Sequence, residues 1–434
     1  MHSWSHPHLP VLAGPGPRPQ LQDTATGRRT DPVEDGVAHL YVCGITPYDS
    51  THLGHAFTYV AFDTLNRVWR DAGVAVTYVQ NVTDVDDPLL ERAEQTGVDW
   101  RELAADQVQL FRTDMQALRV LPPEHYVGVV EVVDLVVAAV ERVLAAGGAY
   151  WVEQDVYADL SADPRFGSVS NLDRREMAQL FAERGGDPDR EGKRDPLDPL
   201  LWRGRRPGEP WWDGASLGPG RPGWHIECGA IAAHHLGLPV TLEGGGQDLV
   251  FPHHDMGTSH LRFLQEQADA EPIRSYLHTG LVAYQGAKMS KSLGNLVFVS
   301  GLLADGVDPR AVRLVLLAHH YSESWEYSEA ELADATERLQ RWLVAAGPAA
   351  GPGAPAGAAG GPVSAGAHTQ PTTPAPESRQ SEPGSAVVTE MRAALADNLD
   401  TAACLKVVDR AAATGTFAPE VITAVDALLG IDLR

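Results

Sequence analysis

The stretch YVCGITPYDSTHLGH, residues 41–55, predicts a strand that runs into a helix, and this junction decides the fold. Apolar residues fill 38–45, those of 56–73 recur at helical spacing, and the β-branched run 74–84 predicts a second strand. A strand, a helix and a strand in close succession form a βαβ unit, which implies a parallel sheet. Ligands bind such sheets beyond the carboxyl ends of the strands, where Cys43 lies.

The tetrapeptide HLGH, residues 52–55, stands where the predicted helix begins. A helix N-terminus presents unpaired N–H groups and positive dipole, and therefore suits an anion. His52 and His55 could donate to phosphate oxygens there, and Gly54 would let a nucleotide approach the backbone closely. Two surface histidines without a ligand would give the same letters, so both interpretations stay open at this point.

A second cationic motif, KMSKS, occupies residues 288–292. Lys288 and Lys291 are flanked by small hydroxyl residues and glycines, as in a mobile lid that closes over a triphosphate. The alternative is a solvated polar turn before a helix. Together, HLGH after an early strand and KMSKS after a late one indicate a nucleotide-binding site far more specifically than either motif does alone.

The composition is that of a cytoplasmic protein. Its 434 residues include 34 basic and 58 acidic ones, and the formal net charge of −24 disfavours a polyanionic partner. The sequence has no run long enough to cross a membrane and no pattern of a secretion signal at its start. Cys43, Cys228 and Cys404 are too few for a disulfide framework, and a reducing compartment is expected.

With these motifs the chain resembles the class I aminoacyl-tRNA synthetases, whose signatures are written HIGH and KMSKS. Five stretches resemble motifs of the cysteinyl enzymes, in family order, and the resemblance covers about residues 20–340: YVCGITPYDSTHLGH, NVTDVDDPLL, RPGWHIECGA, GGGQDLVFPHHD and KMSKSLGN. The resemblance implies an α/β fold with a Rossmann-like catalytic core, a helical insertion and a small C-terminal helical region.

The expected organisation follows from that resemblance and from shifts in composition. The units are an N-terminal extension (1–36), the first half of the core (37–105), a mainly helical insertion (106–200), the second half with the KMSKS loop (201–300), a helical stem (301–346), a disordered Ala/Gly/Pro-rich loop (347–386) and a C-terminal helical segment (387–434).

The resemblance also implies a zinc site that binds the thiolate of a cysteine substrate. Its ligands would be Cys43, Cys228 and His253, the first histidine of FPHHD. Zinc is four-coordinate and thiophilic, so three protein ligands leave one position open. Cysteinyl-tRNA synthetases read HHENE here and use the final Glu as a fourth ligand, whereas this chain has Gly257 at that position.

Other departures point to a neighbouring family. GPTVYD of the synthetases is GITPYD here, no sizeable anticodon-binding domain follows KMSKSLGN, and the chain is strongly acidic. These features, with ERGGDP at 183–188, resemble the family of L-cysteine:glucosaminyl-inositol ligases of mycothiol biosynthesis. The implied partners are L-cysteine, ATP with Mg²⁺ and glucosaminyl-inositol, with no stable nucleic acid partner, and we expect a monomer. The alternatives are a cysteinyl-tRNA synthetase with a reduced C-terminus and a non-catalytic zinc-binding relative.

The implied roles divide the site residues into three groups. His52, His55, Lys288 and Lys291 would act on the phosphates, and Cys43, Cys228 and His253 would hold zinc. The residues expected around the cysteinyl adenylate and its nucleotide are Cys43, Gly44, Ile45, Thr46, Thr58, Asn81, Val82, Thr83, Trp224, Gly246, Gln247, Asp248 and Val282. For the acidic run NVTDVDD, helix capping is as good an interpretation as catalysis.

Overall fold

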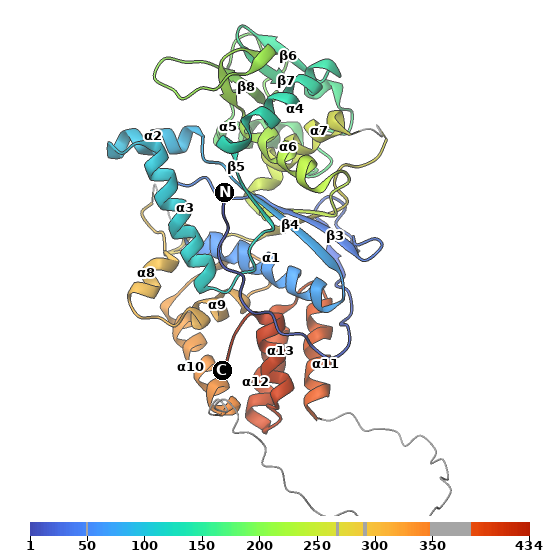
Figure 1. The fold of residues 1–434 in the computed structure, drawn as a ribbon, viewed down its shortest axis with the longest axis vertical. Coiled ribbons are helices and arrows are strands. Elements are labelled where there is room, and N and C mark those ends of the chain that lie inside the picture. Colours follow the sequence, from blue (N-terminus) through green and yellow to red (C-terminus); the bar gives the residue numbers. More distant parts are fainter. Residues whose placement is uncertain (49–50, 266–268, 290–292, 348–382) are drawn as a thin grey trace, which may run out of the picture.

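A computed structural model of the chain describes residues 1–48, 51–265, 269–289, 293–347 and 383–434. Its centre is a five-stranded parallel sheet in the order β11-β10-β3-β4-β5. Figure 1 labels three of these strands, β3, β4 and β5. The strands are β3 (Val37–Val42), β4 (Ala75–Val82), β5 (His125–Gly128), β10 (Leu242–Gly246) and β11 (Tyr276–Thr279). The predicted α/β class with a parallel sheet is therefore confirmed.

Side chains of β3 alternate between two apolar cores, one on each face of the sheet. Leu40 and Val42 join the core that contains helix α1 (Leu53–Asp71). Tyr41 and Cys43 join the core that contains helices α4 (Val133–Ala145) and α6 (Trp224–Leu236). Because successive residues of a strand point to opposite faces, the register of β3 sends Cys43 toward α6 and away from α1.

The segment between β5 and β10 contains more strand than its sequence pattern indicates. Besides helices it holds an antiparallel sheet in the order β6-β7-β8-β9. The strands are β6 (Ala149–Val152), β7 (Asp155–Ala158), β8 (Leu200–Gly204) and β9 (Gly220–Pro222). Besides α4 and α6, the helices of this segment are η1 (Val129–Val132), η2 (Leu160–Ala162), α5 (Arg174–Glu183) and η3 (Ala215–Leu217), and α7 (Asp255–Leu264) follows β10. The strands have three to five residues each, too few for a clear alternation.

Helices α2 (Asp87–Thr96) and α3 (Trp100–Ala117) connect β4 to β5, and a short hairpin, β1 (Leu21–Gln22) and β2 (Arg29–Thr30), lies near the start. After β11 come β12 (Val282–Tyr284), β13 (Ala287–Lys288), α8 (Val299–Ala304), α9 (Pro309–Leu317), β14 (Trp325–Glu326), α10 (Glu329–Ala346), α11 (Pro383–Ala396), α12 (Thr401–Thr414) and α13 (Pro419–Leu429). Of the loop predicted at 347–386, residues 348–382 lie outside the described part of the chain, and α11 already begins at Pro383. No helix among the described residues is long and apolar enough to cross a membrane.

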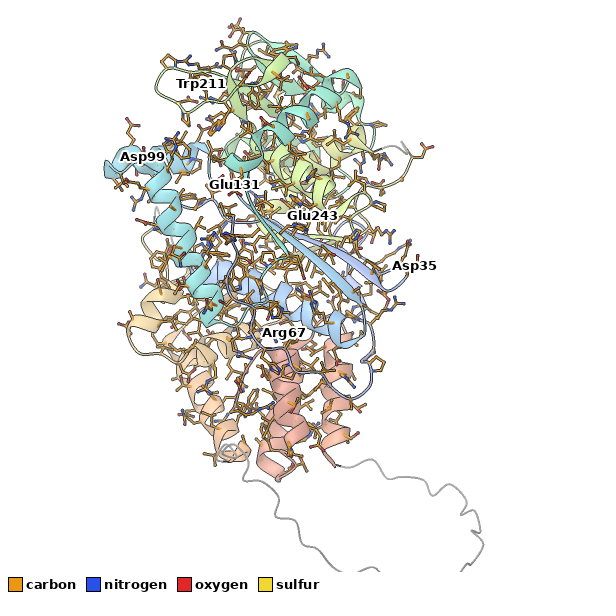
Figure 2. The ribbon with its side chains drawn as sticks, in the orientation of Figure 1. Asp35, Arg67, Asp99, Glu131, Trp211 and Glu243 are labelled. Atoms are coloured by element: carbon orange, nitrogen blue, oxygen red, sulfur yellow. The ribbon has the colours of Figure 1, made fainter. Side chains whose placement is uncertain are left out.

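A buried ionic network ties α1 to the C-terminal helices. Asp63 of α1 accepts hydrogen bonds from Arg67 Nε at 2.7 Å and from Arg313 of α9. The two guanidinium groups extend the network to the end of α13, because Arg67 donates to the carbonyl of Asp426 and Arg313 to that of Leu429. Figure 2 places Arg67 at this junction, between α1 and the helices of the C-terminal region. The helix that begins with HLGH is thereby fixed along its middle and C-terminal half.

Candidate active site and metal centre

A cavity of about 550 Å³ opens beyond the carboxyl ends of β3 and β10. From β3 the chain proceeds to β4 and β5 on one side, and later returns to β10 and β11 on the other. The cavity therefore lies at the point where the strand order reverses, which is where open α/β sheets bind ligands. Its lining includes most residues expected from the sequence: Cys43, Gly44, Ile45, Thr46, His52, His55, Thr58, Asn81, Thr83, Trp224, Cys228, Gly246, Asp248, His253, Val282 and Lys288.

Three expected residues are not part of that lining. The side chain of Val82 is buried in the core on the α1 side of the sheet. Gln247 is exposed, and its Nε2 donates to Ser324 Oγ at 3.2 Å. Lys291 lies outside the described residues. The lining also contains residues that were not expected from the sequence: Tyr48 and Met289, which lie within the quoted motifs, and Tyr59 and Leu281, which lie outside them.

The HLGH motif forms the N-terminus of α1. His52 is the N-cap, and its Nδ1 accepts a hydrogen bond from the Gly54 N–H at 3.1 Å. A side chain on Gly54 would meet the His52 ring at 2.9 Å, which explains the glycine. The rings of His52 and His55 stack with centroids 3.9 Å apart.

Both imidazoles are neutral near pH 7. Burial, with Lys288 as a smaller contribution, lowers the pKa of His55 to about 4, although Asp248 opposes the shift. Burial likewise lowers the pKa of His52, more strongly. Because Nδ1 of neutral His52 accepts the Gly54 N–H, its proton sits on Nε2, which is left to donate to a ligand. The pair can thus offer hydrogen bonds to phosphate oxygens without holding a charge.

Lys288, the first lysine of KMSKS, pairs with Asp248 after β10, with Nζ 2.9 Å from Oδ2. Burial opposes ionisation of Asp248, but Lys288 outweighs it, and the pKa of the carboxyl lies below its ordinary value. The chain after KMSKS is bonded to HLGH: Leu53 N–H donates to the Val297 carbonyl at 2.9 Å, and Val299 N–H to that of Thr51 at 3.0 Å. The two motifs therefore share one wall of the cavity.

The ends of β3 and β4 are held together by Asn81. Its Oδ1 accepts from the Gly44 N–H at 2.7 Å, and its Nδ2 donates to Thr83 Oγ1 at 3.1 Å. A side chain on Gly44 would lie 1.6 Å from the Asn81 carbonyl oxygen, so only glycine fits. Thr58 on α1 meets Thr279 at the end of β11, with 2.8 Å between their hydroxyl oxygens. These contacts give the cavity rigid polar walls.

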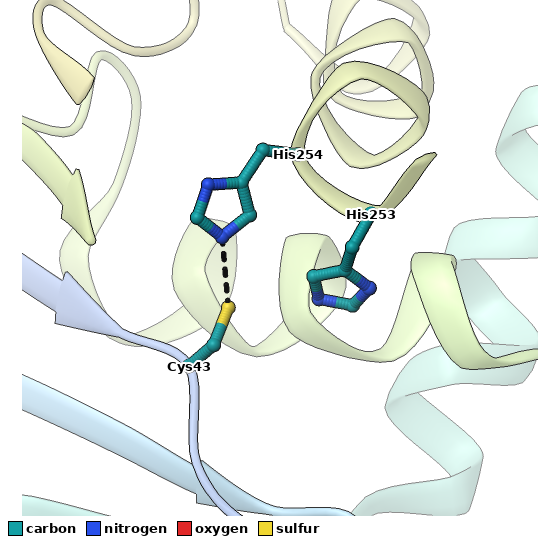
Figure 3. A group of neighbouring side chains, drawn as sticks. All are labelled: Cys43, His253 and His254. Carbon is teal, nitrogen blue, oxygen red and sulfur yellow. Dashed lines mark hydrogen bonds between the residues drawn. The ribbon is translucent and has the colours of Figure 1, made fainter. Parts of the chain in front are cut away.

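A buried group of thiol and imidazole side chains lies at the floor of the cavity (Figure 3). The Cys43 sulfur is 4.0 Å from that of Cys228 and 3.2 Å from His254 Nε2. Potential ligand atoms of Cys43, His253 and His254 all lie within 4.8 Å of one another. Thiolate and imidazole are ligands that zinc prefers, so these residues fit the expected metal. Gly257, on α7, has no side chain to contribute.

His254 is the residue at this centre that the sequence motifs did not single out. Its Nδ1 lies 2.7 Å from His278 Nε2, and His278 Nδ1 lies 2.8 Å from Thr24 Oγ1. The neighbouring His253 stacks on Trp224, with ring centroids 4.6 Å apart, and its Nδ1 is 3.1 Å from that of His225. The second histidine of FPHHD was the sequence signal that could have indicated this residue. Both imidazole rings contact a buried histidine, His254 through His278 and His253 through His225.

Comparison with known proteins agrees with this geometry. Residues 29–337 match the family of tRNA synthetases class I (C) catalytic domain. The L-cysteine:1D-myo-inositol 2-amino-2-deoxy-alpha-D-glucopyranoside ligase of Beutenbergia cavernae is 56% identical over 452 residues, and that of Xylanimonas cellulosilytica 55% over 436; each alignment covers 100% of both chains.

The fold has solved counterparts at low sequence identity. Mycobacterium tuberculosis methionyl-tRNA synthetase in complex with methionyl-adenylate superposes with a TM-score of 0.60 at 15% identity, covering 91% of this chain and 92% of that one. Such a likeness shows the fold alone, whereas the full-length relatives define the family. The chain belongs to the class I tRNA synthetase (C) catalytic-domain family and, within it, to the family of L-cysteine:1D-myo-inositol 2-amino-2-deoxy-alpha-D-glucopyranoside ligases.

Proposed function

We propose that this protein is an ATP-dependent ligase that joins L-cysteine to the amine of glucosaminyl-inositol through a cysteinyl adenylate. The observation that carries the proposal is one cavity that combines the N-terminus of α1 with its two histidines, a lysine and a buried thiol–imidazole centre. Relatives at 51% to 56% identity over their full length have a name that states this pair of substrates.

In the first step a carboxylate oxygen of cysteine attacks the α-phosphorus of ATP. A P–O bond to the amino acid forms, and the bond to pyrophosphate breaks. Neutral His52 and His55, at the N-terminus of α1, would donate to the phosphate oxygens as charge develops on them. Lys288 would leave Asp248 for the departing pyrophosphate, and Mg²⁺ would accompany ATP. Asp248, freed from the lysine, would then be available to a ribose hydroxyl.

The thiol of the substrate would be recognised at the floor of the cavity. Cys43, Cys228 and His253 would hold zinc, which when bound supplies a thiophilic Lewis acid that prefers the thiolate of cysteine to the hydroxyl of serine. A pocket without such a centre would separate these two side chains poorly. Trp224, stacked on His253, would shield the centre from water.

In the second step the neutral amine of the sugar attacks the activated carbonyl. The amide C–N bond forms, the bond to AMP breaks, and the amine loses a proton. The rigid contacts of Gly44, Asn81 and Thr83 would hold the adenylate while the acceptor enters. An amino sugar suits an acidic chain of net charge −24 better than a long RNA does, because RNA binding requires many cationic contacts.

The test supplies ATP and cysteine with either glucosaminyl-inositol or cysteine-accepting transfer RNA and follows AMP release. The sugar should stimulate release, with little sensitivity to moderate salt. Transfer RNA should not accept cysteine at a comparable rate. Efficient charging of the RNA, with no effect of the sugar, would replace the ligase proposal by a cysteinyl-tRNA synthetase.

A further inference from the structure

The motif ERGGDP, residues 183–188, lies outside the cavity, and no step proposed above uses it. It begins where α5 ends: Arg184 is the C-cap, and its N–H donates to the carbonyls of Leu180 and Phe181. The Arg184 side chain, which is half-buried, extends from there to the segment that follows β10.

The guanidinium of Arg184 binds two backbone carbonyls of that segment. Its Nη1 donates to the carbonyl of Asp248 at 2.6 Å and also to that of Phe251. The first carbonyl belongs to the cavity residue that pairs with Lys288, and the second lies two residues before His253. One side chain therefore braces the backbone at the nucleotide end and at the metal end of the same seven-residue stretch, 247–253.

This stretch needs an external brace because its backbone is irregular. A 3₁₀ turn, Gln247–Leu249, leads into the π-type turn Val250–His254, and Phe251 within it has non-helical angles, φ −134° and ψ 134°. The backbone N–H groups at the ends of these turns donate to other carbonyls: Val250 to Gln247, and Asp255 to Val250 and Pro252. A charged donor is worth more to a carbonyl than a neutral one, and the two N–H groups on one guanidinium nitrogen, Nη1, can each take one of the two carbonyls.

The rest of the motif holds Arg184 in place. Gly185 adopts φ +86°, and a side chain on Gly186 would lie 2.5 Å from the Phe181 ring. The turn therefore requires both glycines. Asp187 accepts hydrogen bonds from Tyr157 Oη and from Lys193 Nζ, the latter at 3.0 Å. Phe181 itself packs in one apolar cluster with Phe251, which closes the contact between α5 and the braced stretch.

We infer that Arg184 is a positioning residue that fixes the nucleotide-contacting Asp248 and the metal-binding His253 relative to each other. The inference rests on the proposed function, since it assigns these two residues their ligands. It predicts that loss of the guanidinium weakens ATP binding and metal retention together, although Arg184 contacts neither site directly.

The experiment compares Arg184→Gln with the matched control Arg174→Gln. Arg174 begins the same helix and pairs with Asp195 at the surface. The Kd of Mg·ATP is measured by calorimetry, and zinc loss to a chelator is followed with a metal-sensitive dye. Arg184→Gln should weaken ATP binding at least fivefold and speed zinc loss at least fivefold. Arg174→Gln should match wild type, and Arg184→Lys should fall between, because the lysine ammonium keeps the charge and its N–H donors but sits on a flexible stem and is not pre-organised as the planar guanidinium is.

The effect of each substitution on ATP and zinc binding is separated from its effect on the stability of the fold. Thermal unfolding is measured in parallel, and binding is compared well below the unfolding temperature. A lower Tm with unchanged ATP and zinc behaviour would show a purely structural brace and overturn the inference, as would a change in only one of the two readouts. Should Arg184→Gln not fold, Arg184→Lys is read by the same criteria. Wild-type protein that binds neither ATP nor zinc would refute the proposed function as well.

Discussion

Replacing Asp63 by asparagine tests whether the HLGH helix and the C-terminal helices share one core. The carboxylate of Asp63 is fully buried and accepts from Arg67, from Arg313 and from the Leu121 N–H, the last at 2.7 Å. Burial opposes its ionisation, but Arg67 and Arg313 outweigh that cost and lower the pKa of Asp63. In the native protein a single anion thus faces two buried cations.

The loss in free energy of unfolding expected for Asp63→Asn follows from the two buried guanidinium groups that the neutral amide no longer compensates. Asparagine keeps the volume of the side chain and one carbonyl oxygen, so no cavity forms and the Leu121 bond can persist. Arg67 and Arg313 lose their counter-charge while they stay buried, and removing one partner of a buried ion pair typically costs about 3–5 kcal/mol. Burial already lowers the pKa of Arg313 to about 10, which shows how poorly this site tolerates an uncompensated cation.

The free energy of unfolding is measured by urea titration, with fluorescence and circular dichroism recorded together. The control is Asp397→Asn, whose partner is Arg29; the two side chains are 66% and 50% exposed, so a loss of at most about 1 kcal/mol is expected. Asp63→Asn should lose several times more and yet bind Mg·ATP normally at low urea, because the network lies outside the cavity. Equal losses for the two variants would refute the reasoning, since the buried charges would then contribute no more than surface ones.

Three further predictions concern the site and its surroundings. Purified protein should contain about one zinc per chain, and Cys43→Ser should lose most of it while staying folded; full occupancy in Cys43→Ser and Cys228→Ser by atomic absorption would exclude the proposed ligands. Lys291→Ala should slow ATP–pyrophosphate exchange at least tenfold, which corresponds to about 1.4 kcal/mol of transition-state stabilisation. An unchanged exchange rate would contradict the proposed role of Lys291 and favour the interpretation of KMSKS as a solvated turn. Burial raises the pKa of Asp114 from its ordinary value of 3.8 to about 7, so between these pH values the native state keeps a proton that the unfolded chain has released, and stability should fall as pH rises from about 4 to 7. Asp114→Asn should flatten that fall in thermal unfolding, and identical slopes would contradict the assignment.

The sequence predicted those parts of the fold that are local and strongly patterned. The succession β3, α1 and β4 follows from apolar runs, helical spacing and the glycine that ends the helix, and these act within a few residues. The order of strands in the sheet is set by pairing between distant segments, such as β3 with β10, which periodicity does not encode. The short strand β5 and the antiparallel strands β6 to β9 were not predicted for the same reason. Their stability comes from pairing with neighbouring strands rather than from the pattern of their own few residues.

The site was predictable where a motif names the residue and its neighbours are fixed by short-range geometry. Cys43, His52 and Asp248 belong to this group, and all three line the cavity. The approach of His254 to Cys43 could not be foreseen, since it depends on an irregular turn at Val250–His254 that rotates both imidazoles inward. The contacts of Arg184 were equally hidden, because they join segments more than sixty residues apart through backbone carbonyls, which carry no sequence signal.

The arrangement at the end of β3 explains why one strand-to-helix junction carries both a thiol and two histidines. Because side chains alternate along β3, Cys43 faces α6, where Cys228 lies, while the chain turns to the opposite face and enters α1 with His52. In the proposed reaction the thiol and the carboxylate that attacks ATP belong to one small amino acid, so the metal centre and the phosphate site must lie within its length. A slip of β3 by one residue would turn Cys43 toward α1 and separate the two sites. The register of this single strand therefore sets the distance across which cysteine is held and activated.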